Sequence, residues 1–368
     1  MSTDSTISNV SGNYRAQYKP LKFKDTNKNR IIEKNSSEKY KDTDSKKRTI
    51  DHILSKIKSS GMDKNEKAIL FNKALNIART IVDPFDKAMA IKDIACGMIE
   101  AEMEHHEIVS VLKEALGIVR TFDEFVDDSA DKAFEIMWIA SKLDIVGSSK
   151  NEVNGLLKEA LGITRTIKEI SVKADHLGRV ASAMADAKLN KDEISKIFIE
   201  ALDTAKIIEE IIEVGYPEKE DCIRNIASRI AKSGLDKNEL RKLFIKALEV
   251  AQTIKKSSGR EWTIAIIASF TAEAGLIKEA LGIANGLKDQ DFKEDALTDI
   301  AAEMGKAKSD KHETIKVFKE ALEIGKNCKD LELRSTGFGY IAERMAEAGL
   351  NKNEIITVFK ELGLEPPK

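Results

Sequence analysis

The chain has little of what small disulfide-bonded domains and β-rich folds depend on. Its 368 residues include 3 Cys and 5 Pro, and aromatic residues make up 5%. Cys96, Cys222 and Cys328 lie more than 100 residues apart and form no CxxC pair. This spacing argues against a disulfide framework and against a zinc site, and it fits a reducing compartment. The shortage of aromatic residues argues against sandwiches and barrels.

Membrane, targeting and catalytic motifs are also missing as local patterns. No run approaches the roughly 18 apolar residues of a membrane helix, and the start MSTDSTISNVSGNY has no apolar core typical of a signal peptide. Phosphate loops, GxSxG, HExxH and paired catalytic carboxylates are absent. We therefore expect a cytoplasmic protein with no membrane partner, no cofactor, no metal and no enzymatic activity. An enzyme whose site is assembled from distant segments would leave no local motif, so it remains the alternative.

Charge is plentiful but unevenly distributed along the chain. Charged residues make up 33% and the net charge is −2. Residues 1–49 contain 9 Lys and 3 Arg against 4 Asp and 2 Glu, a surplus of six positive charges, so the remainder carries about −8. An acidic body argues against nucleic acid as a partner, because phosphate binding needs clustered Lys and Arg.

The first 49 residues lack any apolar period and are rich in Ser, Thr, Lys, Asn and Asp. We expect this basic segment to be a disordered tail, because it has too little apolar surface to offset its chain entropy. Its Ser/Thr/Asn-rich start is also similar to the uncleaved N-terminal signals of bacterial type III secretion effectors. That similarity implies a translocated protein as the alternative to a cytoplasmic one.

Residues 50–366 repeat two dipeptide markers. The spacings between successive Ala-Leu pairs are 41, 45, 41, 46, 33 and 41, so the basic period is near 41. The Ala-Leu pairs begin at Ala74, Ala115, Ala160, Ala201, Ala247, Ala280 and Ala321. Between them, Ile-Ala or Val-Ala pairs begin at Ile94, Ile139, Val180, Ile226, Ile267, Ile300 and Ile341. Apolar residues flank each marker at helical spacing, which predicts two amphipathic helices per unit, the Ala-Leu helix and the Ile-Ala helix.

The turn from each Ile-Ala helix to the next Ala-Leu helix has its own pattern. Glycines placed to end a helix with positive φ stand eight residues after the Ile, at Gly61, Gly147, Gly234, Gly275 and Gly349. A capping-box phrase of the type DKNE follows at 63–66, 149–152, 190–193, 236–239, 310–313 and 351–354. In the second unit this phrase is EHHE, residues 104–107. We therefore interpret His105 and His106 as part of a capping turn and not as metal ligands, since adjacent helical residues point about 100° apart.

Three units depart from the basic length. FDEFVDD and EEIIEVGYPE lengthen the second and fourth units and predict loops or extended helix ends. After Ile267 the step to the next Ala-Leu pair falls from 21 to 13, which predicts a shortened turn.

The tandem helix pairs, with Ala where helices cross and Gly at turns, resemble the tetratricopeptide-like α-solenoids. The resemblance covers residues 50–366 as seven helix-turn-helix repeats flanked by two half-repeat caps, IDHILSKIKSSG and NEIITVFKELG. It implies an all-α, right-handed superhelix whose concave groove binds peptides or protein segments.

A line of basic and polar residues on the Ala-Leu helices is the main candidate site. It contains Arg79, Lys113, Arg120, Lys158, Arg165, Lys206, Lys319 and Lys326. One interpretation is a groove for an acidic peptide or a C-terminal carboxylate. The other is a solvated face whose cations pair with Glu at i±3 or i±4.

Trp138 is the second candidate, because it stands just before the marker Ile of its helix and points away from the apolar stripe. It could anchor a partner or be covered by the longer loop of its unit. Together these features predict a non-catalytic scaffold that binds a protein or peptide, possibly acidic. Helical-repeat RNA binding remains the alternative, although the acidic body counts against it.

Overall fold

A computed structural model describes residues 27–122, 128–209, 218–327 and 331–366. Within these ranges the chain forms sixteen α-helices and no strand, which confirms the all-α prediction. The Ile-Ala helices are the odd-numbered ones: α1 (Asn27–Ser59), α3 (Pro84–Glu100), α5 (Asp128–Ile145), α7 (Ile170–Asp186), α9 (Glu218–Lys232), α11 (Ser257–Glu273), α13 (Gln290–Lys306) and α15 (Leu331–Glu347). The Ala-Leu helices are the even-numbered ones: α2 (Lys64–Arg79), α4 (His105–Arg120), α6 (Lys150–Thr166), α8 (Lys191–Lys206), α10 (Lys237–Ala251), α12 (Ile277–Asn285), α14 (Lys311–Lys326) and α16 (Lys352–Glu361).

The markers found in the sequence lie at the centre of the core. The Ala of every Ala-Leu pair has a relative exposure of 0%. The Ile or Val that begins each Ile-Ala or Val-Ala pair has a relative exposure of 0% or 1%. Alanine at these positions lets neighbouring helix backbones approach closely. Three residues before the Ala, Phe71, Phe198 and Phe318 fill the space between helices and are also fully buried.

The predicted solenoid of adjacent helix pairs is confirmed, and the contacts show which neighbours pack most extensively. From α1 to α14, each odd-numbered helix packs more extensively against the even-numbered helix that follows it than against the one before it. The short turn that carries the capping phrase joins the two helices of such a pair. The two helices therefore run antiparallel. From α1 to α14 the observed unit is therefore a hairpin of an odd and an even helix, whereas α15 packs more extensively against α14 than against α16.

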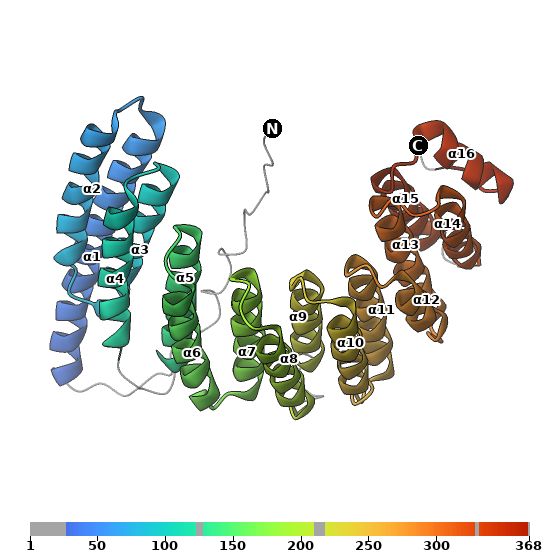
Figure 1. The fold of residues 1–368 in the computed structure, drawn as a ribbon, viewed down its shortest axis with the longest axis horizontal. Helices are drawn as coiled ribbons and strands as arrows, with labels where there is room; N and C mark the ends of the chain where they lie inside the picture. Colours follow the sequence, from blue (N-terminus) through green and yellow to red (C-terminus); the bar gives the residue numbers. More distant parts are fainter. Residues whose placement is uncertain (1–26, 123–127, 210–217, 328–330, 367–368) are drawn as a thin grey trace.

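The hairpins stack into an open arc (Figure 1). Neighbouring odd-numbered helices contact each other at α1 and α3 and at each step from α5 to α15. Among the described even-numbered helices, such contacts join α8 to α10 and α14 to α16. The more closely spaced layer of a curved stack is its inner layer, so the odd-numbered helices form the concave side.

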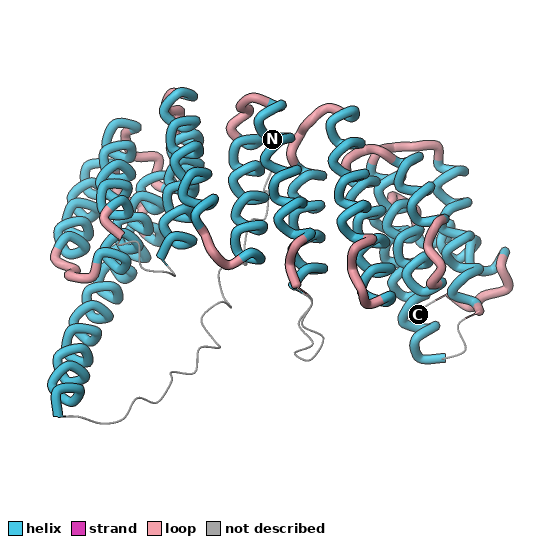
Figure 2. Tube along the Cα trace, turned by 90° about the horizontal axis from the view of Figure 1, so that it is seen from below, coloured by secondary structure: helices cyan, strands magenta, loops and turns pink. Residues whose placement is uncertain are grey.

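Helix α1 corrects the predicted boundary of the tail. The helix begins at Asn27 and not near residue 50, and its N-terminal part extends beyond the neighbouring helices (Figure 2). Thr43 is buried, Lys46 Nζ donates to the Thr80 carbonyl at 3.2 Å, and Lys47 Nζ lies 2.5 Å from Asp86 Oδ1. Polar contacts thus hold a segment that has no apolar period. The rest of the predicted tail, residues 1–26, lies outside the described residues.

The turns confirm most of the predicted helix ends. Gly147, Gly234, Gly275 and Gly349 have positive φ, whereas Gly61 does not. In the three units without glycine, the equivalent left-handed position is occupied by Glu102, Lys188 and Lys308, with φ of 51°, 54° and 54°. The helix end therefore keeps its geometry even where the side chain disfavours it.

The predicted N-caps form in six of the seven phrases. The side chains of Asp63, Ser149, Asn190, Asp236, Asp310 and Asn351 accept a hydrogen bond from the N–H of the Glu three residues later. Glu104 makes no such bond, although its carbonyl accepts from Glu107 N–H at 3.0 Å. EHHE is thus a helix start without the predicted side-chain cap, because Glu replaces the shorter Asp, Asn or Ser.

The unit-length changes have different origins. The inserted segments fall largely on residues 123–127 and 210–217, outside the described residues. After α11 the shortening affects the helix more than the turn, which keeps Gly275. Helix α12 has 9 residues where most even-numbered helices have 15 to 17.

Replacing Lys308 with glycine should raise the free energy of unfolding by about 0.5–1 kcal/mol, because a left-handed side chain costs about 1–2 kcal/mol and glycine returns part of this as chain entropy. Urea unfolding followed by circular dichroism measures the change. Gly349→Ala, at the equivalent position with φ 89°, should lower stability instead. Equal effects of the two substitutions on stability would contradict the left-handed conformation of Lys308 and Gly349.

Candidate functional site

The predicted line of cations lies on the even-numbered helices, and its arginines bridge consecutive repeats. Arg79 Nη2 lies 2.7 Å from Glu114 Oε2. Arg120 Nη2 lies 2.6 Å from Glu159 Oε2, and Arg165 Nη2 lies 2.7 Å from Glu200 Oε2. In each pair Nε donates to the other carboxylate oxygen, so the contact is bidentate.

Most of the lysines of the line also reach the next repeat. Lys113 and Lys158 lie 2.8 Å and 3.3 Å from the capping-phrase carboxylates Glu152 and Glu193. Lys319 Nζ lies 2.6 Å from Glu361 Oε2, and Lys326 Nζ donates to the Leu362 carbonyl at 3.0 Å. Lys206 is exposed at the end of α8.

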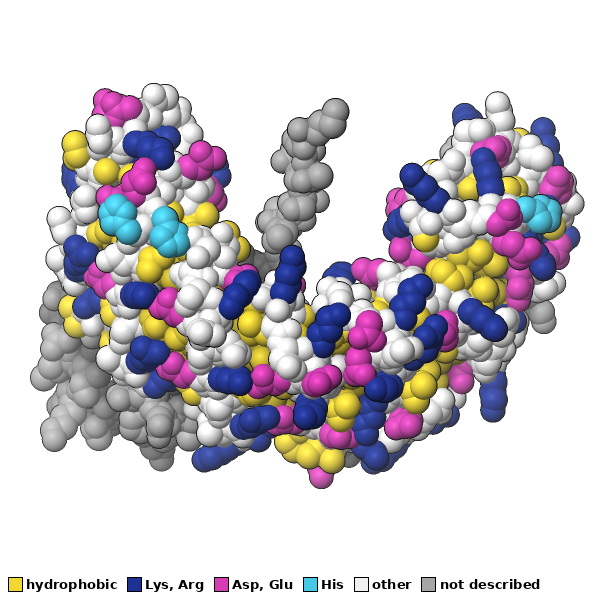
Figure 3. Space-filling model, viewed as in Figure 1, with side chains coloured by type: hydrophobic (Ala, Val, Ile, Leu, Met, Phe, Trp, Pro, Cys, Tyr) yellow, Lys and Arg dark blue, Asp and Glu magenta, His cyan; other side chains and the backbone are white. Residues whose placement is uncertain are grey.

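These contacts join repeats and do not run along one helix at i±3 or i±4, as one interpretation expected. The glutamates bound by arginine stand immediately before the Ala-Leu markers. Figure 3 shows basic and acidic side chains interspersed along the face that it presents. Each exposed pair contributes about 0.2–1 kcal/mol. Binding of a partner by these cations stays a prediction, and it would have to compete with the glutamates.

Trp138 lies on α5, half-buried, in the column that faces the inner side of the arc. Lys92 Nζ lies 4.6 Å and Lys142 Nζ 5.3 Å from its ring centroid. Lys92 also pairs with buried Glu135 at 2.9 Å. Two lysines therefore flank the ring, whereas part of the loop expected to cover it, residues 123–127, lies outside the described residues. Its role as an anchor stays a prediction.

Residues at the same position in other repeats line a cavity, which the sequence did not predict as a site. Its volume is about 540 Å³, and it lies between α11, α13 and α15 on the inner side. Ile266, Asp299 and Tyr340, which line it, occupy the position of Trp138 in their own repeats. The other lining residues important here are Trp262, Asp291, Glu294 and Asp295.

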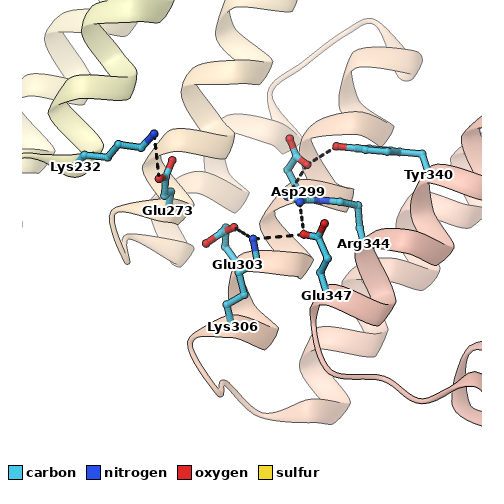
Figure 4. A network of polar contacts seen from close by, with 8 residues as sticks. All are labelled: Lys232, Glu273, Asp299, Glu303, Lys306, Tyr340, Arg344 and Glu347. Carbon is cyan, nitrogen blue, oxygen red and sulfur yellow. Dashed lines mark hydrogen bonds and ion pairs between the residues drawn. The ribbon is translucent and has the colours of Figure 1, made fainter. Parts of the chain in front are cut away.

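One wall of the cavity is fixed by a polar network between α13 and α15 (Figure 4). Tyr340 donates its hydroxyl to Asp299 Oδ1 at 2.6 Å, and Arg344 Nη2 lies 2.9 Å from the same oxygen. Arg344 also pairs with Glu347, which in turn lies 3.5 Å from Lys306 Nζ. The Tyr340 hydroxyl and Asp299 are thus held in place, and the charge of Asp299 is balanced by Arg344.

Glu294 is held in a narrow space between two helices. A Cβ atom at Gly325 would lie 2.8 Å from Glu294 Oε2, and one at Gly337 would lie 3.0 Å from Oε1. A larger residue at either position would therefore push the carboxylate aside. This gives Gly337 of the GFGYIAE segment the packing role expected of it.

The carboxylates of the cavity repel one another. Burial, together with the nearby Asp295 and Asp291, raises the pKa of Glu294 to about 7. Burial, together with Asp299 and Asp291, raises the pKa of Asp295 to about 6. Within the described residues, no cation forms an ion pair with Asp291, Glu294 or Asp295. The cavity therefore concentrates negative charge that costs free energy near neutral pH.

Another hollow of about 720 Å³ lies between α1 and α2. Its lining is mainly aliphatic, amide and hydroxyl groups, and of its two cations, Lys46 and Lys73, the first pairs with Asp42 at 2.5 Å. It concentrates no comparable charge, so the acidic cavity is the stronger candidate.

Two further findings concern metal binding and membrane crossing in the described part of the chain. Its His, Cys, Asp and Glu side chains form no group of three or more able to hold a metal ion, the cavity included. None of its helices combines the length and the apolar composition that crossing a bilayer requires.

The pH dependence of stability should reveal Glu294. The folded protein binds more protons than the unfolded chain between the ordinary pKa of 4.5 and about 7, so Glu294 lowers stability as pH rises through this window. His176, whose pKa burial lowers to about 4, acts oppositely between about 4 and 6.5. We therefore expect the melting temperature of Glu294→Gln, relative to the parent protein, to increase from pH 5 to pH 8. A pH-independent difference would contradict the raised pKa.

Comparisons with known proteins show only likeness of fold. No protein-family model matches the chain, and no curated protein matches it. Similar solved structures include that of Ton1535 from Thermococcus onnurineus NA1, with 18% identity, TM-score 0.40 and coverage of 79% of this chain and 99% of that one. A circular tandem repeat protein with novel repeat topology has 12% identity, TM-score 0.39 and coverage of 88% and 94%. A signal transduction ATPase with a tetratricopeptide repeat sensor, PH0952 from Pyrococcus horikoshii, has 14% identity, TM-score 0.31 and coverage of 88% and 52%. The chain is a helical repeat protein.

Proposed function

We propose that the chain is a non-catalytic, tetratricopeptide-like scaffold that binds a segment of another protein on the inner face of its arc and acts in the cytoplasm. The observation that carries the proposal is a surface formed by successive odd-numbered helices, along which side chains outside the core stay accessible. Trp138, Trp262, Ile266 and Tyr340 are among them. Partly exposed aromatic residues are typical of binding anchors.

The thiols support a non-catalytic protein. Burial raises the pKa of Cys222 to about 12 and raises the pKa of half-buried Cys96. Both groups are therefore protonated at neutral pH and are poor nucleophiles.

The charges support a protein partner over RNA. The arginines of the even-numbered helices are paired with glutamates, and the cavity on the inner face is acidic. A groove for single-stranded RNA carries cations beside its aromatic rings, whereas Trp262 and Tyr340 line the acidic cavity.

The inner face is tested by two matched substitutions that each place a charge on a solvent-accessible isoleucine. Ile266→Lys alters the inner face at α11, and Ile245→Lys alters the outer helix α10, where Ile245 is 57% exposed. We expect a stoichiometric partner, captured from cells of the source organism and identified by mass spectrometry, to be lost with Ile266→Lys and retained with Ile245→Lys. The reverse result would move recognition to the outer helices, and recovery of RNA without protein would favour the alternative function.

A second candidate surface is the line of cations on the even-numbered helices, which could hold an acidic segment. Glu114→Gln, Glu159→Gln and Glu200→Gln together would free Arg79, Arg120 and Arg165 from their partners. If these arginines bind a partner, its affinity should rise several-fold although stability falls by about 0.2–1 kcal/mol for each lost pair. Unchanged affinity with lower stability, measured by calorimetry and thermal unfolding, would leave the pairs a structural role alone.

A further inference from the structure

We propose that the cavity between α11, α13 and α15 binds a lysine or arginine side chain of the partner segment. The proposal rests on the proposed function, because it specifies which chemistry one part of the inner face recognises. It differs from the acidic partner predicted for the outer line of cations.

Charge is the first argument. Asp291, Glu294 and Asp295 face the cavity, and within the described ranges none of them is paired with a cation. The lining contains one cation, Arg334, which has contacts of its own. An incoming cationic side chain would relieve the repulsion among the three carboxylates.

Comparison with other inner-face acids shows that this arrangement is local. Between α3 and α5, Glu135 pairs with Lys92 at 2.9 Å. Between α7 and α9, Asp175 Oδ1 lies 2.8 Å from Arg229 Nη1. These junctions supply their own cation, whereas at the cavity only Asp299 receives one, from Arg344.

The aromatic walls are the second argument. Trp262 and Tyr340 line the cavity and are 38% and 36% exposed. Arg224 from the preceding repeat lies over one face of the Trp262 ring, 3.7 Å from its centroid, so this indole already takes part in a cation–π contact. Aromatic faces beside carboxylates favour guanidinium and ammonium groups over neutral side chains.

Rigidity and size are the third argument. Asp299 is held by Tyr340 and Arg344, and Glu294 lies against Gly325 and Gly337. Acceptors fixed in advance lose little entropy when a cation binds. The volume of about 540 Å³ lies within the roughly 300–1,000 Å³ typical of ligand pockets. A bare metal ion fits less well, because the described carboxylates are not grouped to coordinate one.

The test uses the full-length chain carrying Trp138→Phe, which leaves Trp262 as the only tryptophan. The probe is a synthetic peptide in which arginine alternates with serine, and a peptide with glutamate in place of arginine is its counterpart. We expect the basic peptide to change Trp262 fluorescence saturably and the acidic peptide to have no effect. Increasing salt should weaken the binding, because the contact is partly exposed.

Matched variants separate a specific cavity from general attraction by net charge. Asp291→Asn with Asp295→Asn removes two charges from the cavity, and Glu249→Gln with Glu323→Gln removes two exposed charges from α10 and α14. Removing like charges should not lower the stability of either variant. Thermal unfolding of both variants checks this. We expect the cavity variant to bind the basic peptide about tenfold more weakly and the control variant to bind normally. Equal weakening by both variants, or by neither, would overturn the proposal.

The pH provides an independent readout. Binding should strengthen from pH 5.5 to pH 8, as Asp295 and Glu294, whose pKa values are about 6 and about 7, lose their protons. The other charged or titratable groups that face them are Asp291 and Asp299 on α13 and Arg334 and Tyr340 on α15. Binding that is independent of pH would contradict the assignment.

The basic N-terminal residues of the same chain are the competing occupant. Replacing Arg15, Lys19, Lys22 and Lys24 with glutamine tests them. If the peptide binds only after these changes, the tail fills the cavity and the proposal of a partner side chain falls. If no basic peptide binds while Ile266→Lys still abolishes partner capture, only the cavity proposal fails and the scaffold stands.

Discussion

The structure depends on the fact that no single hairpin can bury its own apolar surface. Each pair of helices presents apolar residues to the hairpin before it and to the hairpin after it, so the core is continuous along the arc. The fully buried alanines of the Ala-Leu markers set the distance between backbones at each crossing. A larger side chain there would separate two repeats and change the curvature of everything beyond them.

Polar contacts between repeats favour one register of this apolar stacking. On the outer side, bidentate pairs such as Arg120 with Glu159 connect repeats at the same position in three successive units. On the inner side, Glu135 with Lys92 and Asp299 with Arg344 connect neighbouring odd-numbered helices. Exposed pairs stabilise little individually, but they penalise a slipped register, because slippage would leave carboxylates beside one another. The acidic cavity is the described junction where such balance is least complete.

The sequence was sufficient to predict the repeat, the helices and most turns, because each depends on residues close together in the chain. Marker alanines, N-caps and four of the five turn glycines could be identified by their spacing alone. The left-handed conformation of Lys188 and Lys308 could have been inferred by aligning them with Gly147, since they occupy the equivalent position. The start of α1 could not be predicted, because residues 27–49 have no apolar period.

The cavity could not be predicted from the sequence, for a different reason. Trp262, Glu294 and Tyr340 come from three successive repeats, and their meeting depends on how tightly those repeats pack. The column of Ile266, Asp299 and Tyr340 gave one signal, since it marks the side of each helix opposite the core. The cross-repeat partners of Arg79 and Arg120 had a similar signal, because a glutamate precedes five of the seven Ala-Leu pairs.

The short helix α12 illustrates how such a chain can vary without losing its working surface. Its 9 residues fall 7 short of the 16 in α14, and 7 residues correspond to almost two helical turns. Loss of nearly whole turns leaves the remaining side chains pointing as before, so Ala280 is still fully buried. Outer helices of this protein can therefore be trimmed or extended by whole turns during evolution while the concave side keeps its shape.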